Sequence, residues 1–251
     1  MQLVPVPAFN DNYIWLMHDG RHALAVDPGD AGPVKDFIAQ HDLVLAAILI
    51  THHHGDHTGG LPAFAGRCPV YGPAAEAIAG VTHPLREGDE VTVPALDVRF
   101  EILELPGHTL GHIAYVGPDL VFCGDTLFSA GCGRLFEGTP AQMKHSLEKL
   151  AALPPTTRVC CTHEYTLANL AFAQAAEPDN PARDAWLAEC KRLRDAGLPT
   201  LPSTIGKERA INPFLRVDRP SVIEGLSHFV GHVPKDPAHA FAALRAWKNE
   251  F

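Results

Sequence analysis

LVLAAILITHHHGDH, residues 43–57, joins an uninterrupted run of eight apolar residues to four histidines and one aspartate. The apolar run predicts a fully buried strand over residues 43–50, since no polar residue marks a solvent-facing side. The polar run has the pattern H-x-H-x-D-H, so a strand ending here would hold several metal-ligating side chains at one rigid edge. The three histidines and one carboxylate of this pattern, all within residues 52–57, indicate metal binding rather than packing.

Three further candidate ligands follow strand-like segments later in the chain. They lie in LPGHT (105–109), VFCGDT (121–126) and VCCTHE (159–164). The full set of five histidines and two aspartates is enough for two metal ions: His52, His54, Asp56, His57, His108, Asp125 and His163. None of these is a thiolate, and imidazole with carboxylate suits zinc, iron and manganese alike.

The spacing favours a division of the seven ligands between two ions. His52 and His54 are two residues apart, so an extended segment projects them to one side and His53 to the other. We expect one ion to be held by His52, His54 and His108, and the second by Asp56, His57 and His163. Asp125 is then the natural bridging ligand, because its two oxygens can reach two ions.

The other histidines are expected to have ordinary structural roles. His53 should face away from the metal ligands. For His112, four residues after His108, packing in a strand is the expected role and an outer contact to the metal site is the alternative. The remainder are expected to be surface or hydrogen-bonded residues: His18, His22, His41, His83, His145, His228, His232 and His239.

Composition excludes several classes of protein. A net charge of −9 argues against nucleic acid or an anionic membrane as the main partner. The longest apolar run, eight residues, is too short to cross a bilayer. No secretory signal is visible at the N-terminus. The six cysteines contain no C-x-x-C pair, so we expect reduced core thiols and a cytoplasmic protein.

The expected secondary structure changes near residue 165. Before it, strands and loops alternate with occasional helices, and after it the sequence is mostly helical. Expected strands cover 13–17, 23–26, 43–50, 97–102, 112–116, 120–123 and 158–161, and expected helices cover 33–41 and 140–150. Apolar and charged residues alternate in 97–102, which predicts a half-solvated strand, and Thr139 and Asn180 are expected to open the helices that follow them. Beyond the boundary, helical segments are expected at 165–176, from 181 to a stop at Gly197, and at 237–249, with a loop containing Pro199, Pro202, Gly206 and Pro213.

These motifs resemble those of the metallo-β-lactamase superfamily, through THHHGDH, His108, the segment 124–126 and His163. More narrowly, the sequence resembles the hydroxyacylglutathione hydrolases, or glyoxalase II enzymes. The narrower likeness lies in NDNY (10–13), DPG (27–29), GDTLFSAGCGR (124–134), THEYT (162–166), PST (202–204) and NPFLR (212–216). It covers essentially the whole chain.

The resemblance implies an α/β fold: a four-layer αββα sandwich in residues 1–165, with the dinuclear site at one edge, and a smaller helical domain in residues 166–251 that helps to bind glutathione. The implied activity is hydrolysis of S-D-lactoylglutathione, and of related 2-hydroxyacylglutathiones, to D-lactate and glutathione by a metal-bound hydroxide. This is the second step of methylglyoxal detoxification. The implied cofactors are two divalent ions, zinc first and iron or manganese as alternatives. The implied partner is this small molecule alone, bound by a monomer.

The resemblance also assigns the glutathione-binding residues to Arg134, Tyr165, Arg245 and Lys248. Arg245 and Lys248 are three residues apart and would share one face of the last helix. Two positions depart from the pattern of many relatives: Arg134 replaces a lysine, and Phe136 replaces a tyrosine, which removes one hydroxyl contact to the peptide. A thiolate needs little protonation on leaving, so a thioester suits a site with no dedicated general acid.

Other functions remain as alternatives. Within the superfamily these are a glutathione persulfide dioxygenase with a single iron, a lactonase and a phosphodiesterase. The second set of ligands argues against a single iron, and the negative net charge gives no sign of RNA binding. A metal-dependent binding or scaffold protein that has lost catalysis is the alternative from a different class, but such loss usually removes ligands, and all seven are present.

Overall fold

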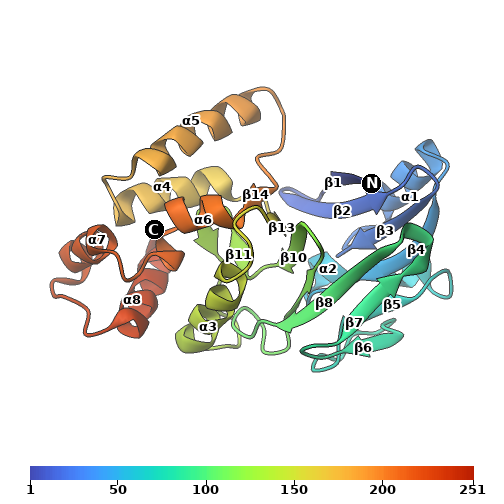
Figure 1. Cartoon of the computed structure of the whole chain (residues 1–251), viewed down its shortest axis with the longest axis horizontal. Helices are drawn as coiled ribbons and strands as arrows, with labels where there is room; N and C mark the ends of the chain where they lie inside the picture. Colours follow the sequence, from blue (N-terminus) through green and yellow to red (C-terminus); the bar gives the residue numbers. More distant parts are fainter. The chain divides into compact units, whose positions relative to one another are not determined.

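The computed structural model describes all 251 residues, and Figure 1 traces their helices and strands. The chain forms two compact units, each assembled from separate stretches of sequence. Unit 1 comprises Met1–Glu104, Leu110–Gly124 and Cys160–His163, and unit 2 comprises Leu105–Thr109, Asp125–Val159 and Glu164–Phe251. The expected division into residues 1–165 and 166–251 stays a prediction. The two units divide the chain differently, because residues 105–109 and 125–159 belong to unit 2. No helix has both the length and the apolar character that a membrane span requires.

The first sheet of unit 1 has six strands in the order of the chain. They are β1 (Gln2–Ala8), β2 (Asn12–His18), β3 (His22–Val26), β4 (Val44–Leu49), β5 (Val70–Pro73) and β6 (His83–Leu85). The pairs β1·β2 and β2·β3 are antiparallel, whereas β3 to β6 run parallel. Because parallel strands end at the same edge, the residues that follow β3 and β4 are brought together there.

A helix connects these two parallel strands, as such a crossover requires. It is α1 (Ala31–Gln40), which begins two residues earlier than expected because the Asp30 side chain caps it, accepting a hydrogen bond from the Gly32 amide. The short helices α2 (Gly55–Thr58) and η1 (Leu61–Phe64) follow β4. The core between sheet and helices contains Ile14, Ile48 and Phe64.

The expectation that the apolar run 43–50 forms a fully buried strand is wrong for its first half. Strand β4 is buried from Ala47 onward, but Val44 is 59% exposed and Leu45 is only half-buried. The physical reason is that α1 and η1 do not fully cover the start of the strand, so Val44 lines a surface depression beside Lys35 and Arg67. An apolar run in the sequence does not indicate which of its residues the neighbouring helices cover.

A second, antiparallel sheet faces the first within unit 1. It contains β7 (Glu90–Val93), β8 (Val98–Glu104), β9 (Ile113–Val116) and β10 (Leu120–Gly124), with the short helix η2 (Pro94–Leu96) between β7 and β8. The predicted alternation in β8 is confirmed, since Phe100 and Ile102 are buried and Arg99 is exposed. The buried Tyr115 hydroxyl donates to the Ile50 carbonyl (2.9 Å) and so ties the two sheets together.

Unit 2 is mostly helical. Its elements are the hairpin β11 (Leu127–Phe128) and β12 (Gly131–Cys132), α3 (Pro140–Ala151), β14 (Ser203–Thr204), and the helices α4 (Thr166–Ala176), α5 (Pro181–Asp195), α6 (Ile205–Ile211), η3 (Pro213–Leu215), α7 (Pro220–Val230) and α8 (Pro237–Glu250). Strand β13 (Arg158–Cys161) starts in unit 2, where its first two residues pair with β14, and ends in unit 1. In Figure 1 the helices α4 to α8 occupy the yellow-to-red part of the chain.

The predicted helix starts in unit 2 are confirmed, but two helices were missed. Thr139 caps α3 in a capping box with Gln142, and Asn180 caps α5. The missed helices, α6 and α7, lie in or just after the segment expected to be a loop because of its prolines and glycine. Gly206 lies in the first turn of α6 and Pro220 in the first turn of α7, and neither residue breaks its helix. A proline in the first turn removes no intrahelical hydrogen bond.

Candidate metal centre

The metal-site residues of unit 1 lie at the edge where the parallel strands β3 and β4 end. Asp27 follows β3, and the run from Thr51 to His57 follows β4 and ends in the single turn α2. The two loops touch: a Cβ atom on Gly29 would lie 1.8 Å from the Asp56 carbonyl oxygen, so only glycine allows this approach. The DPG turn after β3 therefore packs directly against the histidine loop.

Asp56, His57 and His163 form one group with the geometry of a metal site. Their ligand atoms lie within 4.8 Å of one another. The Nε2 atoms of His57 and His163 each lie 3.5 Å from Oδ2 of Asp56. Both imidazoles are buried, while the Asp56 side chain is 41% exposed. The group therefore offers two nitrogens and an oxygen to one ion, with access from solvent.

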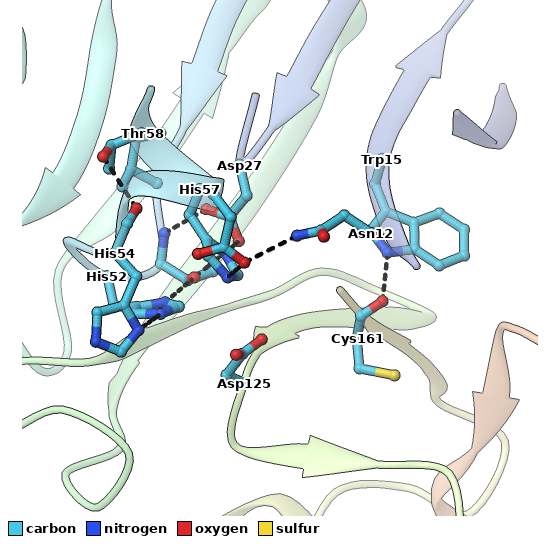
Figure 2. Close-up of polar contacts among 12 residues, drawn as sticks. Asn12, Trp15, Asp27, His52, His54, His57, Thr58, Asp125 and Cys161 are labelled. Atoms are coloured by element: carbon cyan, nitrogen blue, oxygen red, sulfur yellow. Dashed lines mark hydrogen bonds and ion pairs between the residues drawn. The ribbon is translucent and has the colours of Figure 1, made fainter. Parts of the chain in front are cut away.

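A carboxylate fixes the orientation of each of these two imidazoles. Nδ1 of His57 lies 3.0 Å from Oδ2 of Asp27, and Nδ1 of His163 lies 2.7 Å from Oδ1 of Asp11. Because a carboxylate only accepts, both Nδ1 atoms carry the proton and both Nε2 lone pairs are left for a metal. Asn12 donates a hydrogen bond to Oδ2 of Asp56 (3.0 Å) and so orients this carboxylate, and Figure 2 shows the Asn12 side chain pointing toward Asp27 and His57.

His52 and His54 converge on a second point. Nε2 of His52 and Nδ1 of His54 are 3.0 Å apart, close enough for one ion to take both. His53 points the other way, as predicted, and its Nδ1 lies 3.0 Å from Glu76. The hydroxyl of Thr51 lies 3.1 Å from Nδ1 of His52 and also donates to Asp27 (2.8 Å), so a single carboxylate orders both parts of the loop.

His112 takes the alternative role rather than the expected one. Its ring is fully buried and stacks on that of His52, with centroids 4.8 Å apart and planes at 22°. Gly124 leaves room for this contact, since a Cβ atom there would lie 2.7 Å from Nε2 of His112 and 2.4 Å from the Thr51 hydroxyl. His112 therefore packs behind a predicted ligand.

The remaining two predicted ligands, His108 and Asp125, form a pair within unit 2. Nε2 of His108 lies 3.4 Å from Oδ2 of Asp125, and both side chains are more than nine-tenths buried. Nδ1 of His108 donates to the carbonyl of Arg134 (2.8 Å), which again leaves Nε2 for a metal. A Cβ atom on Gly133 would lie 1.9 Å from the Asp125 carbonyl, so the Gly-Cys-Gly segment packs directly behind this pair.

The donor atoms fit divalent metal ions. All are imidazole nitrogens or carboxylate oxygens, the ligands that zinc, iron and manganese accept. Five of the seven predicted ligands belong to unit 1 and two to unit 2. In four of the five histidines, His52, His57, His108 and His163, the ring nitrogen that does not face the ligand cluster is engaged by another group, as is usual for metal-binding histidines.

The four residues expected to bind glutathione all belong to unit 2. Arg134 is exposed, and Tyr165 is 38% exposed with its ring edge-on to Phe128. Lys248 is half-buried on α8, where burial first and the charge of Arg245 second lower the pKa of its amine. Arg245 itself is buried, and its Nη1 donates to the Cys132 carbonyl (2.9 Å), so most of this side chain serves the protein interior.

Sequence reasoning missed the residues that hold the ligands. Asp11, Asn12 and Asp27 belong to motifs noted only as part of the family pattern. The sequence did contain a signal for Asp27. This aspartate directly follows a strand, and if that strand runs parallel to the one that precedes the histidines, both strands end at the same edge of the sheet. Asp11 and Asn12 reach the site because Tyr13 donates its amide to the Thr162 carbonyl (2.6 Å), which places β2 beside His163.

Comparisons with known proteins agree with this geometry. Residues 9–80 and 69–163 match the family model of the metallo-beta-lactamase superfamily, and residues 164–251 match the model described as hydroxyacylglutathione hydrolase C-terminus. The hydroxyacylglutathione hydrolase of Cupriavidus metallidurans is 54% identical, over 100% of this chain and 99% of that protein.

Solved structures share the fold. The chain is similar to ETHE1 from Myxococcus xanthus, with a TM-score of 0.66, 26% identity, and 99% of this chain and 98% of that chain covered. It is also similar to TTHA1623 in a di-iron-bound form, with a TM-score of 0.60, 28% identity, and 84% and 100% covered. The expected α/β fold with a helical C-terminal region is confirmed.

Proposed function

The chain belongs to the hydroxyacylglutathione hydrolase family of the metallo-beta-lactamase superfamily, and we propose that it hydrolyses S-D-lactoylglutathione to D-lactate and glutathione. The observation that carries this proposal is full-length identity of 54% to a hydroxyacylglutathione hydrolase. The same match includes the C-terminal segment, which disfavours the lactonase, phosphodiesterase and persulfide dioxygenase alternatives. Related 2-hydroxyacylglutathiones share the reacting group and are proposed as further substrates.

For the metals, we propose that the seven predicted residues hold two ions. His52, His54 and His108 would bind one, Asp56, His57 and His163 the other, and Asp125 would bridge them. The orientation of the ring nitrogens within each unit supports this assignment. When bound, two such ions polarise the thioester carbonyl and lower the pKa of water toward about 7.

In the reaction, a water oxygen bonds to the carbonyl carbon and the carbon–sulfur bond breaks. The thiolate of glutathione leaves, and one water is consumed for each acid and thiol formed. The residues of the chain supply orientation. Asp27 and Asp11 hold His57 and His163 in the tautomer that leaves Nε2 available, and Asn12 holds one oxygen of Asp56.

Substrate binding is proposed to depend on charge, because glutathione is a net anion. Arg134 and Lys248 present cations on unit 2, and Arg and Lys are the usual partners of carboxylates. Tyr165 adds an exposed ring and hydroxyl. Arg245 remains in the proposed set, although its contact with the Cys132 carbonyl leaves only part of the guanidinium for a substrate.

The test is hydrolysis of S-D-lactoylglutathione by the purified protein, followed by loss of thioester absorbance, with metal content measured on the same sample. Turnover with close to two ions per chain is the expected result. His54→Ala should abolish turnover, and the matched control His53→Ala, one residue away, should retain it because His53 faces Glu76 instead. Two ions without thioester turnover would contradict the proposed substrate and retain the metal site.

Three finer points are also proposed: zinc is the native metal, the protein is a monomer, and it acts in the cytoplasm. Metal analysis of protein purified without added metal tests the first point. Light scattering and cell fractionation test the other two. Iron or manganese in the purified protein would contradict zinc, since the ligands accept all three.

A further inference from the structure

The hairpin formed by β11 and β12 connects Asp125 to Arg134, whose carbonyl contacts His108. It begins two residues after Asp125 and ends at Cys132, so it leads straight into Gly133 and Arg134. Arg134 offers its carbonyl to His108, and Gly133 packs against the Asp125 backbone. The shape of this hairpin therefore sets the positions of both Asp125 and the partner of His108.

The hairpin is too short to hold its own shape. Each strand has only two residues, and Ala130 in the turn has a left-handed φ of 56°, which costs energy for a residue with a Cβ atom. Such a conformation persists only where its surroundings hold it in place. Those surroundings are side chains from the C-terminal helices.

Glu208, from helix α6, holds the turn from one side. Its side chain is fully buried, and Oε2 accepts the amide of Ala130 at 2.8 Å. Burial raises the pKa of Glu208, which favours a neutral carboxyl group in this apolar setting. Its polar partners are the Ala130 amide and the side chains of Asn212, Ser129 and Ser203, none of which is a cation.

Asn212 closes the hairpin from the same side. Its Nδ2 donates to the carbonyls of Phe128 (3.2 Å) and Gly131 (2.9 Å), one on each strand, and contacts Oε2 of Glu208 at 3.1 Å. Its Oδ1 accepts the amide of Phe214, which fixes the Asn212 side chain. Glu208 and Asn212 thus form one buried network that binds the hairpin backbone at three points.

We propose that Glu208 and Asn212 are positioning residues for the metal centre, acting through the 127–132 hairpin on Asp125 and on the Arg134 carbonyl that orients His108. The inference rests on the proposed function only in taking Asp125 and His108 as metal ligands. The inference gives helix α6 a role in the metal centre, although it lies some eighty residues after the hairpin in the sequence. The helix fixes the backbone that carries Asp125.

The test measures metal affinity by competition with a chromogenic chelator. Glu208→Leu, which removes the acceptor for Ala130, should weaken the less tightly held ion by about 10- to 100-fold, the range typical of groups behind metal ligands. Glu208→Gln keeps an acceptor oxygen and should retain nearly wild-type affinity. Amide exchange at Ala130 should be faster in the leucine variant and nearly unchanged in the glutamine variant.

A second pair of variants separates positioning from loss of stability. Asn212→Asp keeps the acceptor for Phe214 and removes the donors to Phe128 and Gly131, so it should also weaken metal binding. The control Ile205→Ala removes a buried apolar side chain from the same helix as Glu208, and the hydrogen bonds to the hairpin backbone come from Glu208 and Asn212 instead. It should lower the melting temperature and leave metal affinity unchanged.

Two outcomes would overturn the inference. One is wild-type metal affinity in both Glu208→Leu and Asn212→Asp. The other is equal loss of metal in Ile205→Ala at an equal loss of melting temperature. Thioester turnover is not the readout, so wild-type protein that binds metal but does not cleave S-D-lactoylglutathione would refute the proposed substrate and leave this test intact.

Discussion

The Asp27 carboxylate lies 3.0 Å from Nδ1 of His57, and both side chains are buried at the edge of the first sheet. The same carboxylate accepts the amide and the hydroxyl of Thr51, at 2.8 Å each. One aspartate therefore fixes the tautomer of a proposed ligand and also the start of the loop that carries the other histidines.

Asp27→Asn tests this relationship. The amide can offer an N–H toward His57, which favours protonation at Nε2 instead of Nδ1 and so competes with metal binding. We expect metal affinity and activity to fall together by about 10- to 100-fold. Chelator competition and thioester hydrolysis on the same preparation would measure both. Asp30→Asn, which alters only the cap of α1, is the matched control; an equal loss in the control would contradict the assigned role.

Asp125→Asn tests the proposed bridge. An amide offers one neutral oxygen in place of two charged ones, so it cannot bridge two cations equally well. Metal content and activity should both fall. The loss should exceed the factor of about 10 to 100 that is expected when a residue hydrogen-bonded to a ligand is replaced. Full activity with two ions per chain would rule out the bridging assignment.

Much of this site could be predicted from the sequence, because its ligands are concentrated in one run after one strand. The group Asp56, His57 and His163 is such a case: the run predicted the first two, and the strand ending in CCTH predicted the third. The residues behind the ligands could not be identified in this way. Asp11 reaches His163 through the hydrogen bond between Tyr13 and Thr162, and Asp27 reaches His57 because β3 lies parallel to β4, and neither pairing is written in the motifs themselves.

The same limit applies to the fold. Regular alternation predicted β8, and capping residues predicted the starts of α3 and α5. The burial of β4 could not be predicted, since it depends on where α1 and η1 leave the strand uncovered. Helix α6 was missed because its first turn contains Gly206, and the burial of Ile205, Glu208 and Ile211 that accompanies the helix could not be read from the sequence.

Lys248 and Arg245 should respond differently to substitution, although they lie on the same helix. Lys248 is half-buried with its amine 3.4 Å from the Ala168 carbonyl, so Lys248→Ala should raise KM about two- to fivefold and leave kcat unchanged. Arg245→Ala should instead lower the free energy of unfolding by about 2 kcal/mol, because it leaves the buried Cys132 carbonyl without this donor.

Steady-state kinetics and urea unfolding of both variants would separate the two effects. A fall in kcat alone for Lys248→Ala would show that the residue does not act in capture of the substrate. Unchanged stability of Arg245→Ala would show that the contact with Cys132 contributes little.

Phe136→Tyr adds the hydroxyl that the family resemblance implies at this position. The Phe136 ring is 61% exposed and stands edge-on to His108, with centroids 5.2 Å apart, so a para-hydroxyl fits without displacing other atoms. One added hydrogen bond to the peptide should lower KM about two- to tenfold. Leu135→Ile, a neighbouring change without a polar group, should leave KM unaltered, and equal KM for Phe136→Tyr and the parent would contradict the expected contact.

Protonation of His18 should make the protein less stable in mild acid. Burial first, and then the charge of His41, lower the pKa of His18 below 6.5, while Asp19 opposes this and the N-terminal amine adds to it. The unfolded chain therefore binds this proton more readily than the folded protein. The stability supplied by neutral His18 is complete above pH 6.5 and declines as the pH falls below that value.

Urea unfolding of the parent and of His18→Gln at pH 7.5 and pH 5.5 measures this contribution. The loss of stability between the two pH values should be smaller in the variant. The His18 ring packs edge-on to Phe37, so the variant is also expected to be less stable at both pH values. An equal pH dependence in the two proteins would show that His18 is not the group responsible.

Strand β13 has a consequence for synthesis on the ribosome. Unit 1 needs Cys160–His163 to be complete, and this segment is made only after the hairpin and α3 of unit 2. A nascent chain that has emerged as far as residue 124 therefore lacks both the last stretch of unit 1 and His163. Assembly of the group Asp56, His57 and His163 must follow translation of residue 163, and a transcript truncated before that codon yields a chain that cannot form this proposed metal site.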